Sequence, residues 1–520
     1  MLDPDLWGYR IAHDLICEPL LRRRRPSSSP TPPGAGQPLG GPQGLEQFEG
    51  VLAERVRIDG DGRGIDIWVR RGVRFHDGRP LTAHDVRATL EMVLHSAQSA
   101  PRTQALLADV ARLGLVDKDI VHIDLRRPAR GFLAALTEID ILPAAHFANG
   151  RMLYQPFNRR PMCTGPFRLA EWKRGSQLIL RRAPGYWGTP PAADELRFLI
   201  APDGARGLSR LRQGEADGVL RVPARYLTEQ VEPAAQRGRW VAVERDADQV
   251  VALLWNGRHS VTGQAAVRQA LAGLLDRTRL LREVRAGLGS PVALPPLAAP
   301  PPGPPALTLA QANARLDAAG LVRLGPGSGG PRTVAGRPLR LHVLVPAGSF
   351  ELAEVARRLA EPAARLGLKL EPEVLELGDL LLRLRRGAFE MALVAWAWTG
   401  GDPRPEPEPT HEIDLLPLVR LGIFETDPLL AELVPLLAHA RESGPDAATA
   451  RLQALWQQHE PVTLLYRPRQ VFVLSPSVQS AGAAPGQLSF LGDFLDLRTL
   501  FLAPPGAASP SLLEGRPRAP

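Results

Sequence analysis

Apolar and polar residues alternate regularly in the stretch that begins at Ile65. Ile65, Ile67 and Val69 are apolar, and Asp66, Trp68 and Arg70 separate and follow them. A period of two residues is typical of a strand that buries one face. Two turn-forming dipeptides follow, at residues 71–72 and 77–78. We therefore predict a strand that ends in a turn.

A helical pattern follows the second turn. Thr82 and Asp85 have the spacing of a capping box, in which side-chain oxygens satisfy backbone donors at a helix start. The apolar residues that then share one helical face are Val86, Leu90, Val93 and Leu94. The sequence therefore predicts a capped helix directly after the strand and turn.

Strand and helix patterns alternate between residues 339 and 397. The predicted segments are strand 339–345, helix 351–366, strand 368–375, helix 377–386 and strand 389–397. This alternation favours a largely parallel sheet with crossover helices, and hence an α/β fold.

Shorter patterns cover the rest of the chain, and no internal repeat is present. Strands are predicted at 51–57, 116–125, 250–256 and 462–474, and a two-stranded unit at 167–180. Helices are predicted at 266–282 and 306–320, a helix followed by a turn within 129–147, and a helix and a strand within 206–220.

Composition indicates a soluble globular protein with room for several lobes. The 520 residues allow two to four domains of about 100 to 200 residues each. The net charge of +8 is dominated by arginine, since Lys118, Lys173 and Lys369 are the only lysines. We attribute the arginine excess to coding bias towards G and C. Basic residues are interleaved with 55 acids, so we predict no nucleic-acid partner.

A segment rich in Pro, Gly and Ser follows the charge run Arg22–Arg25. Such composition buries too little apolar surface to order itself, so residues 26–44 are predicted to be a surface loop or linker. A polybasic targeting signal is the alternative. The glycines lack the Lys-Ser or Lys-Thr of a phosphate loop, which argues against nucleotide binding. A similar tail covers residues 503–520.

The two cysteines, Cys17 and Cys163, are too few for a disulfide framework or a four-ligand zinc site. We expect two buried thiols, and a single bridge is the alternative if the protein is exported. No apolar run reaches the ~18 residues of a membrane-spanning helix. The opening MLDPDLWGYR lacks the basic and apolar regions of a signal peptide.

Enzyme motifs are absent from the sequence. There is no G-x-S-x-G, no H-E-x-x-H and no phosphate loop. His76 and His84 lie near Asp77 and Asp85, but turn and capping roles already explain both aspartates. We therefore predict neither catalysis nor a metal or other cofactor.

Four blocks of sequence point to one family. FHDG and LTAHDV stand at the turn and cap after Ile65, TGPFRLAEWKRGSQLILRRAPGYWG begins at Thr164, VVALLWN begins at Val250, and MLDPDLWGYRIAHDLICEPLL opens the chain. In their order along the chain, with the opening block first, they resemble the family 5 extracytoplasmic solute-binding proteins, the peptide and nickel receptors of ABC importers.

The resemblance implies a class II periplasmic-binding-protein fold, with two main lobes joined by a hinge and an inserted small lobe. Lobe I would comprise residues 1–25, 156–247 and 456–520, the small lobe II 26–155, and lobe III 248–455. It also implies a periplasmic or extracytoplasmic location. Family members carry a leader before the LDP-like turn, so we expect that the start of this chain is placed too late or that the leader has been lost.

The resemblance places the ligand site at ALVAWAWTGGD, residues 392–402. Trp396 matches the aromatic residue that packs against bound ligand. Trp398 is either a second ligand contact or lobe core. Thr399 stands where peptide-binding members have an aspartate that pairs with the peptide's ammonium group, and Asp402 belongs to a position that shapes the loop.

Thr399 brings no charge to that position. Removing one partner of a buried ion pair costs about 3 to 5 kcal/mol, or several hundredfold or more in affinity. Either Asp402 has taken over the ammonium group, or the ligand is not a peptide held by its amino terminus. Asn256 and Arg420 are weaker ligand-binding candidates.

The predicted function is that of a substrate-binding component of an ABC importer. It would capture an oligopeptide or similar solute in the cleft between lobes, close around it, and present it to the membrane permease as a monomer. The alternative is a ligand-sensing regulatory protein that uses the same domain without transport.

Overall fold

The structure, a computed structural model, forms two compact units. Unit 1 is drawn from Met1–Val219, Gly238–Val241 and Leu474–Pro520, and unit 2 from Leu220–Arg237 and Ala242–Val473, so the chain passes between units four times. The division into three lobes predicted from the sequence stays a prediction. The residues that the structure describes are 15–23, 48–95, 107, 109–126, 132–137, 139–146, 157, 159–201, 203–220, 222–247, 249–293, 307–324, 330–334, 336–400, 411–413, 447–481, 490–491, 494–495 and 497–503.

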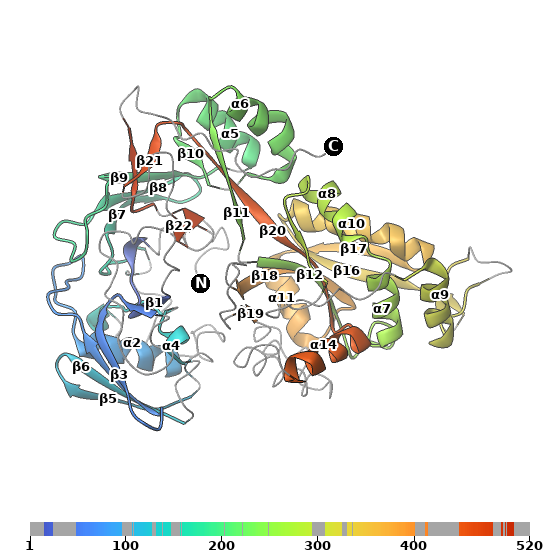
Figure 1. The fold of residues 1–520 in the computed structure, drawn as a ribbon, viewed down its shortest axis with the longest axis horizontal. Coiled ribbons are helices and arrows are strands. Elements are labelled where there is room, and N and C mark those ends of the chain that lie inside the picture. The colour runs from blue at the N-terminus through green and yellow to red at the C-terminus, as the bar shows by residue number, and fades with distance from the viewer. Residues whose placement is uncertain are drawn as a thin grey trace. The chain divides into compact units, whose positions relative to one another are not determined.

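Unit 1 contains a four-stranded antiparallel sheet with a helix packed on it (Figure 1). Its elements are β3 (Ala53–Ile58), β4 (Gly64–Val69), α2 (Ala83–His95), β5 (Val110–Asp117) and β6 (Ile120–Leu125). The strand order is β3-β4-β6-β5, and α2 contacts β5 and β6.

The predicted strand at Ile65 is confirmed, with one difference. Ile65 and Ile67 are fully buried as expected, but Asp66 is buried as well. Its carboxylate pairs with Arg57 and lies 2.7 Å from Nδ1 of His122 on the neighbouring strand. Burial acts to raise the pKa of Asp66, yet the hydrogen bonds from His122 and Arg57 hold it below its ordinary value. A polar position can therefore be buried here because its charge is paired.

The predicted capped helix is confirmed. The Asp85 carboxylate accepts hydrogen bonds from the Thr82 backbone N–H at 2.9 Å and from the Thr82 hydroxyl at 2.7 Å. It also accepts one from the Ala144 N–H at 2.9 Å, which ties the helix start to a distant segment. The predicted apolar face is covered: Val86, Leu90 and Val93 are buried and Leu94 is half-buried.

One predicted segment of unit 1 is wrong in extent. The strand predicted over 116–125 is a hairpin, because the Lys118 N–H bonds the Asp117 carboxylate at 2.7 Å and the chain turns there. In the segment 129–147, predicted as a helix and a turn, the described helical elements are α4 (Phe132–Ala135) and the 3₁₀ turn η2 (Ala144–His146). Backbone between them bonds other segments, since the Ile141 N–H donates to the Glu18 carbonyl at 3.0 Å.

The two-stranded unit predicted at 167–180 is confirmed and gains a third strand. The sheet consists of β7 (Phe167–Lys173), β8 (Gln177–Arg182) and β9 (Glu195–Leu199), with β8 in the middle. A register shift between Leu169 and Glu171 leaves Ala170 without a partner on β8, which is a β-bulge. Other elements of unit 1 are β1 (Leu21–Arg23), β2 (Phe48–Gly50), α5 (Gly204–Gln213), β10 (Gly218–Val219), β21 (Val478–Ser480), β22 (Phe490–Leu491), β23 (Phe494–Leu495) and β24 (Leu500–Leu502).

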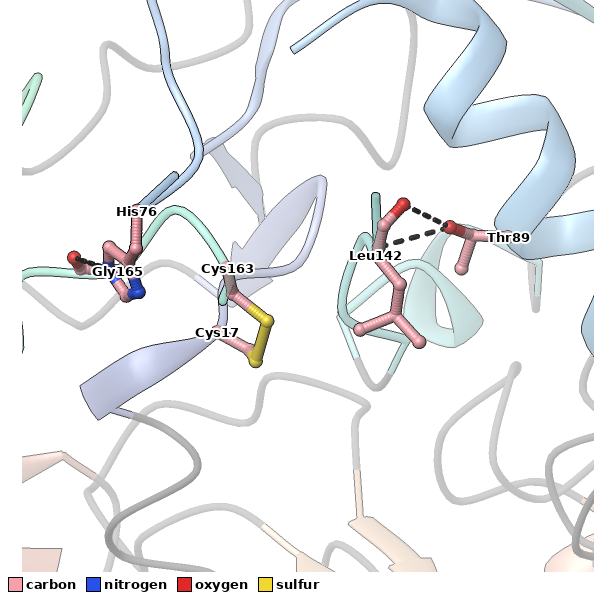
Figure 2. Close-up of a disulfide and its surroundings, with 6 residues drawn as sticks. All are labelled: Cys17, His76, Thr89, Leu142, Cys163 and Gly165. Carbon is pink, nitrogen blue, oxygen red and sulfur yellow. Dashed lines mark hydrogen bonds between the residues drawn. A yellow bond between two sulfur atoms is a disulfide. The ribbon is translucent and has the colours of Figure 1, made fainter. Parts of the chain in front are cut away.

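A disulfide joins Cys17 to Cys163 (Figure 2). Our expectation of two buried thiols was therefore wrong, although both residues are indeed buried. The bridge spans 146 residues of sequence, so no local pattern reveals that the two side chains meet. Next to it the Gly165 N–H donates to the Ile16 carbonyl at 2.8 Å. A Cβ at Gly165 would lie 2.5 Å from that oxygen, so glycine is needed for this close approach.

The tyrosine and tryptophan of the APGYWG block form hydrogen bonds with the buried side chain of Glu18. Glu18 accepts hydrogen bonds from the Tyr186 hydroxyl at 2.6 Å and from Trp187 Nε1 at 2.9 Å. Burial raises the pKa of Glu18 above its ordinary value, and burial together with the neighbouring Glu18 carboxylate raises the pKa of Tyr186. The block therefore serves packing in unit 1, where it and the disulfide fix the same N-terminal segment.

Unit 2 is built on a mixed sheet (Figure 1). Its strands include β11 (Val241–Asp246), β12 (Gln249–Trp255), β13 (Gly289–Pro291), β16 (Arg340–Pro346), β17 (Lys369–Leu375), β18 (Met391–Gly400), β19 (His411–Ile413) and β20 (Val462–Leu474). Strand β16 is parallel to β17 and β18, whereas β12 is antiparallel to β18 and β20. The predicted parallel pairing is confirmed for β16, β17 and β18.

Unit 2 also contains several helices. They are η4 (Ala224–Tyr226), η5 (Leu227–Val231), α6 (Glu232–Gln236), α7 (Ala265–Gly273), α8 (Arg277–Arg285), α9 (Leu309–Ala318), α10 (Phe350–Arg365), α11 (Leu377–Arg386) and α14 (Ala447–His459); β14 (Thr333–Val334) and β15 (Arg337–Pro338) form a small hairpin. The single helix predicted over 266–282 was wrong. It is two helices, because the Asp276 side chain accepts from the Arg279 N–H at 2.8 Å and caps a new helix.

In the part of the chain that the structure describes, no helix combines the length and apolar character needed to span a bilayer.

Candidate functional site

Strand β18 runs out of the core of unit 2 towards its carboxyl end. Met391, Ala392 and Leu393 are buried, Val394 is half-buried and Ala395 is exposed. The register with β16 pairs Val343 with Met391. Extended to the end of β16 at Pro346, this register reaches Val394, and β18 therefore continues for six residues, 395–400, beyond that neighbour. Loss of β16 as a neighbour explains why Ala395 is exposed.

The register places three of the predicted ligand-binding residues on this projecting end. Trp396 lies opposite Val250 of β12. Trp398 and Thr399 lie beyond the end of β12 and pair with Ile413 and Glu412 of β19. The structure therefore brings these three positions together on one strand end. Asp402 and Arg420 lie outside the described residues.

The projecting end lies at the edge of the sheet where ligands are usually found. In open α/β sheets, ligands bind outside the carboxyl ends of parallel strands. The parallel strands β16, β17 and β18 end at Pro346, Leu375 and Gly400, on that edge. Residues 396–400 are therefore our candidate site.

Asn256 lies at the opposite end of β18. It follows Trp255, which pairs with Met391, the first residue of the strand. Its Nδ2 donates to the carbonyls of Gly387 at 3.0 Å and Phe389 at 2.6 Å, and its Oδ1 accepts from the Arg258 N–H at 3.0 Å. The side chain thus fixes the loop that leads into β18, and its role in ligand binding stays a prediction.

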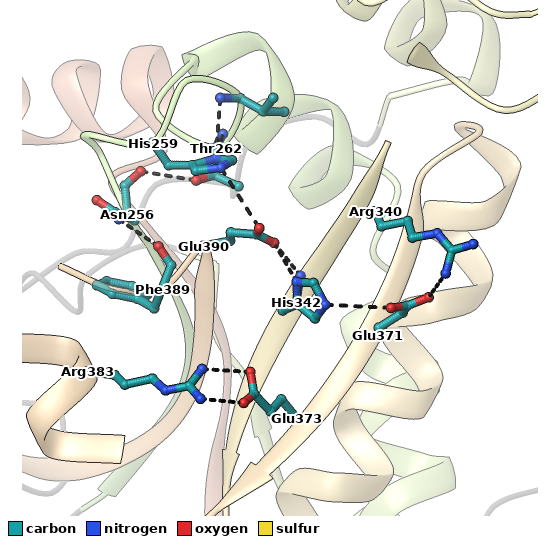
Figure 3. A network of polar contacts seen from close by, with 11 residues as sticks. Asn256, His259, Thr262, Arg340, His342, Glu371, Glu373, Arg383, Phe389 and Glu390 are labelled. Carbon is teal, nitrogen blue, oxygen red and sulfur yellow. Dashed lines mark hydrogen bonds and ion pairs between the residues drawn. The ribbon is translucent and has the colours of Figure 1, made fainter. Parts of the chain in front are cut away.

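A network of ion pairs, missed by the sequence analysis, lies at the amino ends of the parallel strands (Figure 3). His342 Nδ1 is 3.4 Å from the Glu390 carboxylate and its Nε2 is 3.6 Å from Glu371, which also pairs with Arg340 at 3.1 Å. His259 lies 3.9 Å from Glu390. Exposed pairs of this kind contribute about 0–1 kcal/mol each. No described group of three His, Cys, Asp or Glu side chains is arranged to hold a metal ion.

One signal for that network was present in the sequence. Arg340 and His342 alternate along β16, and Lys369 and Glu371 alternate along β17. Parallel register pairs Arg340 with Lys369 and His342 with Glu371. Only the register, which is not visible in the sequence, shows that these side chains are neighbours.

The histidines and aspartates around the first turn do not form one site. His76 is part-buried against unit 1 backbone, with Nε2 2.9 Å from the Gly165 carbonyl, and burial lowers its pKa (Figure 2). Asp77 pairs with Arg79 and Asp85 caps α2. His84 is exposed on that helix. Asp77 and Asp85 thus have the turn and capping roles that the sequence predicted, whereas His76 contacts a distant segment.

Glu460 is a buried acid in a strained backbone conformation between α14 and β20. It is 3% exposed, its φ is 43°, and its Oε1 has no hydrogen-bond partner. Burial raises the pKa of Glu460 to about 7, although the buried arginines Arg277 and Arg268 and a hydrogen bond from Thr463 act to lower it. A non-glycine residue at positive φ costs about 1–3 kcal/mol.

Comparisons with known proteins identify the class. The structure aligns with the nickel-binding protein NikZ of Campylobacter jejuni in complex with Ni(L-His), at a TM-score of 0.72, 16% identity and 94% coverage of both chains. It aligns with the oligopeptide-binding protein AppA of Bacillus subtilis in complex with a nonapeptide, at a TM-score of 0.71, 19% identity, and coverage of 94% of this chain and 98% of AppA. The fold is that of the class II periplasmic binding proteins, as predicted.

The particular family follows from sequence. Residues 47–410 match the model of bacterial extracellular solute-binding proteins, family 5, middle domain. The chain therefore belongs to family 5 of the extracellular solute-binding proteins, which confirms the resemblance drawn from the four blocks.

Curated relatives agree with that assignment. Protein XP55 of Streptomyces lividans is 31% identical over 335 residues, 63% of this chain and 59% of XP55. AppA of B. subtilis is 29% identical over 47% of this chain and 45% of AppA. The dipeptide-binding protein of Escherichia coli is 24% identical over 68% of each. The matched region thus spans about half the length of the first two relatives.

Proposed function

We propose that this protein is the substrate-binding component of an ABC importer and captures an oligopeptide or similar solute at residues 396–402. The observation that supports the proposal is the end of β18, whose backbone at Trp396 and Thr399 lies beyond the last residue of β16 at the carboxyl edge of the sheet. Family membership supports solute binding, and the names of AppA and the E. coli relative support a peptide.

Closure of the lobes around the solute would give the form that the membrane permease recognises. We propose that the protein acts as a monomer outside the cytoplasm. The Cys17–Cys163 disulfide supports that location, because disulfides persist in oxidising compartments. Fractionation of cells that express the complete gene tests it: recovery of the protein in the cytoplasm would favour a regulatory role instead.

The first binding prediction concerns Trp396. We expect Trp396→Ala to weaken peptide binding about tenfold or more, because buried aromatic anchors carry a large share of binding energy. Isothermal titration calorimetry with a mixed oligopeptide library, followed by single peptides, provides the measurement. Trp68→Ala, on strand β4 of unit 1, is the matched control and should bind as the wild type does. Equal affinity of both variants would remove Trp396 from the site.

The second binding prediction concerns the peptide's amino terminus. Thr399 carries no charge, so we expect free and N-acetylated forms of one peptide to bind the wild type within about threefold of each other. In Thr399→Asp we expect the free form to gain about tenfold over the acetylated form, because a carboxylate can form a charge-assisted hydrogen bond with the ammonium group.

A strong preference of the wild type for the free form would contradict this prediction and assign ammonium binding to Asp402. Asp402→Asn then provides the check, since it should abolish the preference. Failure of every peptide to bind would count against the peptide assignment itself.

A further inference from the structure

An open groove of about 670 Å³ lies within unit 1, along strand β7. Residues 169–172 of β7 line it together with Arg174, and Arg159 and Arg160 line it from a preceding segment. The volume falls within the range of about 300–1,000 Å³ that is usual for ligand pockets. The groove belongs to unit 1, whereas the candidate site belongs to unit 2.

The groove carries an excess of positive charge. The guanidinium groups of Arg159, Arg160 and Arg174 form no ion pair within the part of the chain that the structure describes. The acid that lines the groove, Glu171, is already paired with Lys173 at 2.7 Å. Arginine recognises carboxylates through two parallel hydrogen bonds, so an anionic occupant fits this lining.

Arg174 is also supported by an aromatic ring. Its guanidinium lies 5.5 Å from the centroid of the Trp172 ring. A cation at this distance is attracted to the ring face. The contact holds Arg174 over the groove and leaves its hydrogen-bond donors available.

The backbone of β7 adds a second kind of recognition. Among the described strands, β7 pairs with β8 alone, so its other edge has no strand partner. Exposed edges accept an additional extended strand from another chain, with main-chain hydrogen bonds for affinity.

Protection of the edge is the competing explanation for the arginines. Charged side chains on an edge strand discourage pairing, and so does a bulge such as that at Ala170. Arg159 and Arg160, however, come from a different segment, and an open volume remains between them and the strand residues. This arrangement of side chains around an open volume favours ligand binding over simple protection of the strand edge.

We propose that this groove docks an extended, acidic segment of a partner protein, which adds a strand to β7 while its carboxylates pair with Arg159, Arg160 and Arg174. Every group involved in this contact belongs to unit 1.

The test uses the full chain and a fluorescent decapeptide of alternating Glu and Val, with a Gln/Val peptide as the uncharged control. Fluorescence anisotropy should show binding of the Glu peptide that weakens with added salt. Replacement of Arg159, Arg160 and Arg174 by Ser together should weaken binding about tenfold or more. Arg112→Ser, at an exposed position on β5, is the matched control and should bind as the wild type does.

A backbone variant separates strand addition from simple charge attraction. A Glu/Val decapeptide with methyl groups on alternate backbone nitrogens keeps its charge but loses main-chain donors that strand addition needs. This peptide should bind about tenfold more weakly than the unmethylated Glu/Val peptide. Absence of binding, equal binding of the two peptides, or an unaffected triple variant overturns the proposal. If methylation of the peptide backbone has no effect and succinate or phosphate competes fully, the groove is a small-anion site and strand docking is wrong.

Discussion

Loss of the Cys17–Cys163 disulfide is expected to lower the free energy of unfolding of unit 1 by about 5 kcal/mol. The bridge closes a loop with a sequence separation of 146 residues. In the chain-entropy account, a cross-link of this length removes about 5 kcal/mol of conformational entropy from the unfolded chain. That is a large share of the ~5–15 kcal/mol by which a domain is usually stable. Reduction should therefore leave unit 1 marginally stable or unfolded.

Denaturant unfolding with and without dithiothreitol, followed by circular dichroism, provides the measurement. The double variant Cys17→Ala and Cys163→Ala should unfold as the reduced wild type does, and dithiothreitol should not change it further. Because both cysteines are buried, reduction of the native protein should be slow and should accelerate at low denaturant concentrations. An unchanged unfolding midpoint after complete reduction would contradict the prediction.

Glu460→Gln is expected to stabilise the protein at alkaline pH by about 3 kcal/mol. The pKa of Glu460 is about 7 in the folded protein, compared with an ordinary value of 4.5. The folded state therefore holds this proton more tightly than the unfolded state does. Stability linked to Glu460 is complete below pH 4.5 and is lost as the pH rises through 7. A shift of about 2.5 pH units corresponds to about 3 kcal/mol, and glutamine remains neutral throughout.

The difference in unfolding free energy between Glu460→Gln and the wild type should therefore be near zero at acidic pH and should grow up to about pH 8. Glu229→Gln, at an exposed position of η5, is the matched control and should show no such growth. Glu460→Gly should also be stabilising, because glycine adopts the positive φ without strain. Parallel pH curves for wild type and Glu460→Gln would contradict the account.

Local hydrophobic patterns predicted helices and strands well where the residues predicted to be apolar are the ones that pack in the core. The boundaries of α11 and β20 coincide with the predicted segments 377–386 and 462–474. The helix predicted over 266–282 failed because its apolar spacing continues through residues 274–275, while a single side chain, Asp276, starts a second helix. A short cap can interrupt a helix without disturbing its hydrophobic period.

Contacts between residues far apart in the chain could not be predicted from the sequence. The burial of Asp66 depends on Arg57 and His122 from neighbouring strands, and the pairing of Cys17 with Cys163 depends on the path of the whole N-terminal segment. The candidate site shows the same limit. The family resemblance pointed to Trp396 and Thr399. Only the strand register shows that β18 is longer than β16 and that these two residues lie on the part of β18 beyond the end of β16.

The four passages of the chain between units also constrain the order in which the protein can fold. Neither unit is a continuous segment, and unit 1 includes Leu474–Pro520, where β24 pairs with β21. Neither unit can therefore be completed until most of the chain is present. Cys17 and Cys163 both lie in the first third of the sequence, so in an oxidising compartment their bridge can form before Leu474–Pro520 joins unit 1. An early cross-link would thus hold the first part of unit 1 together until its final segment packs against it.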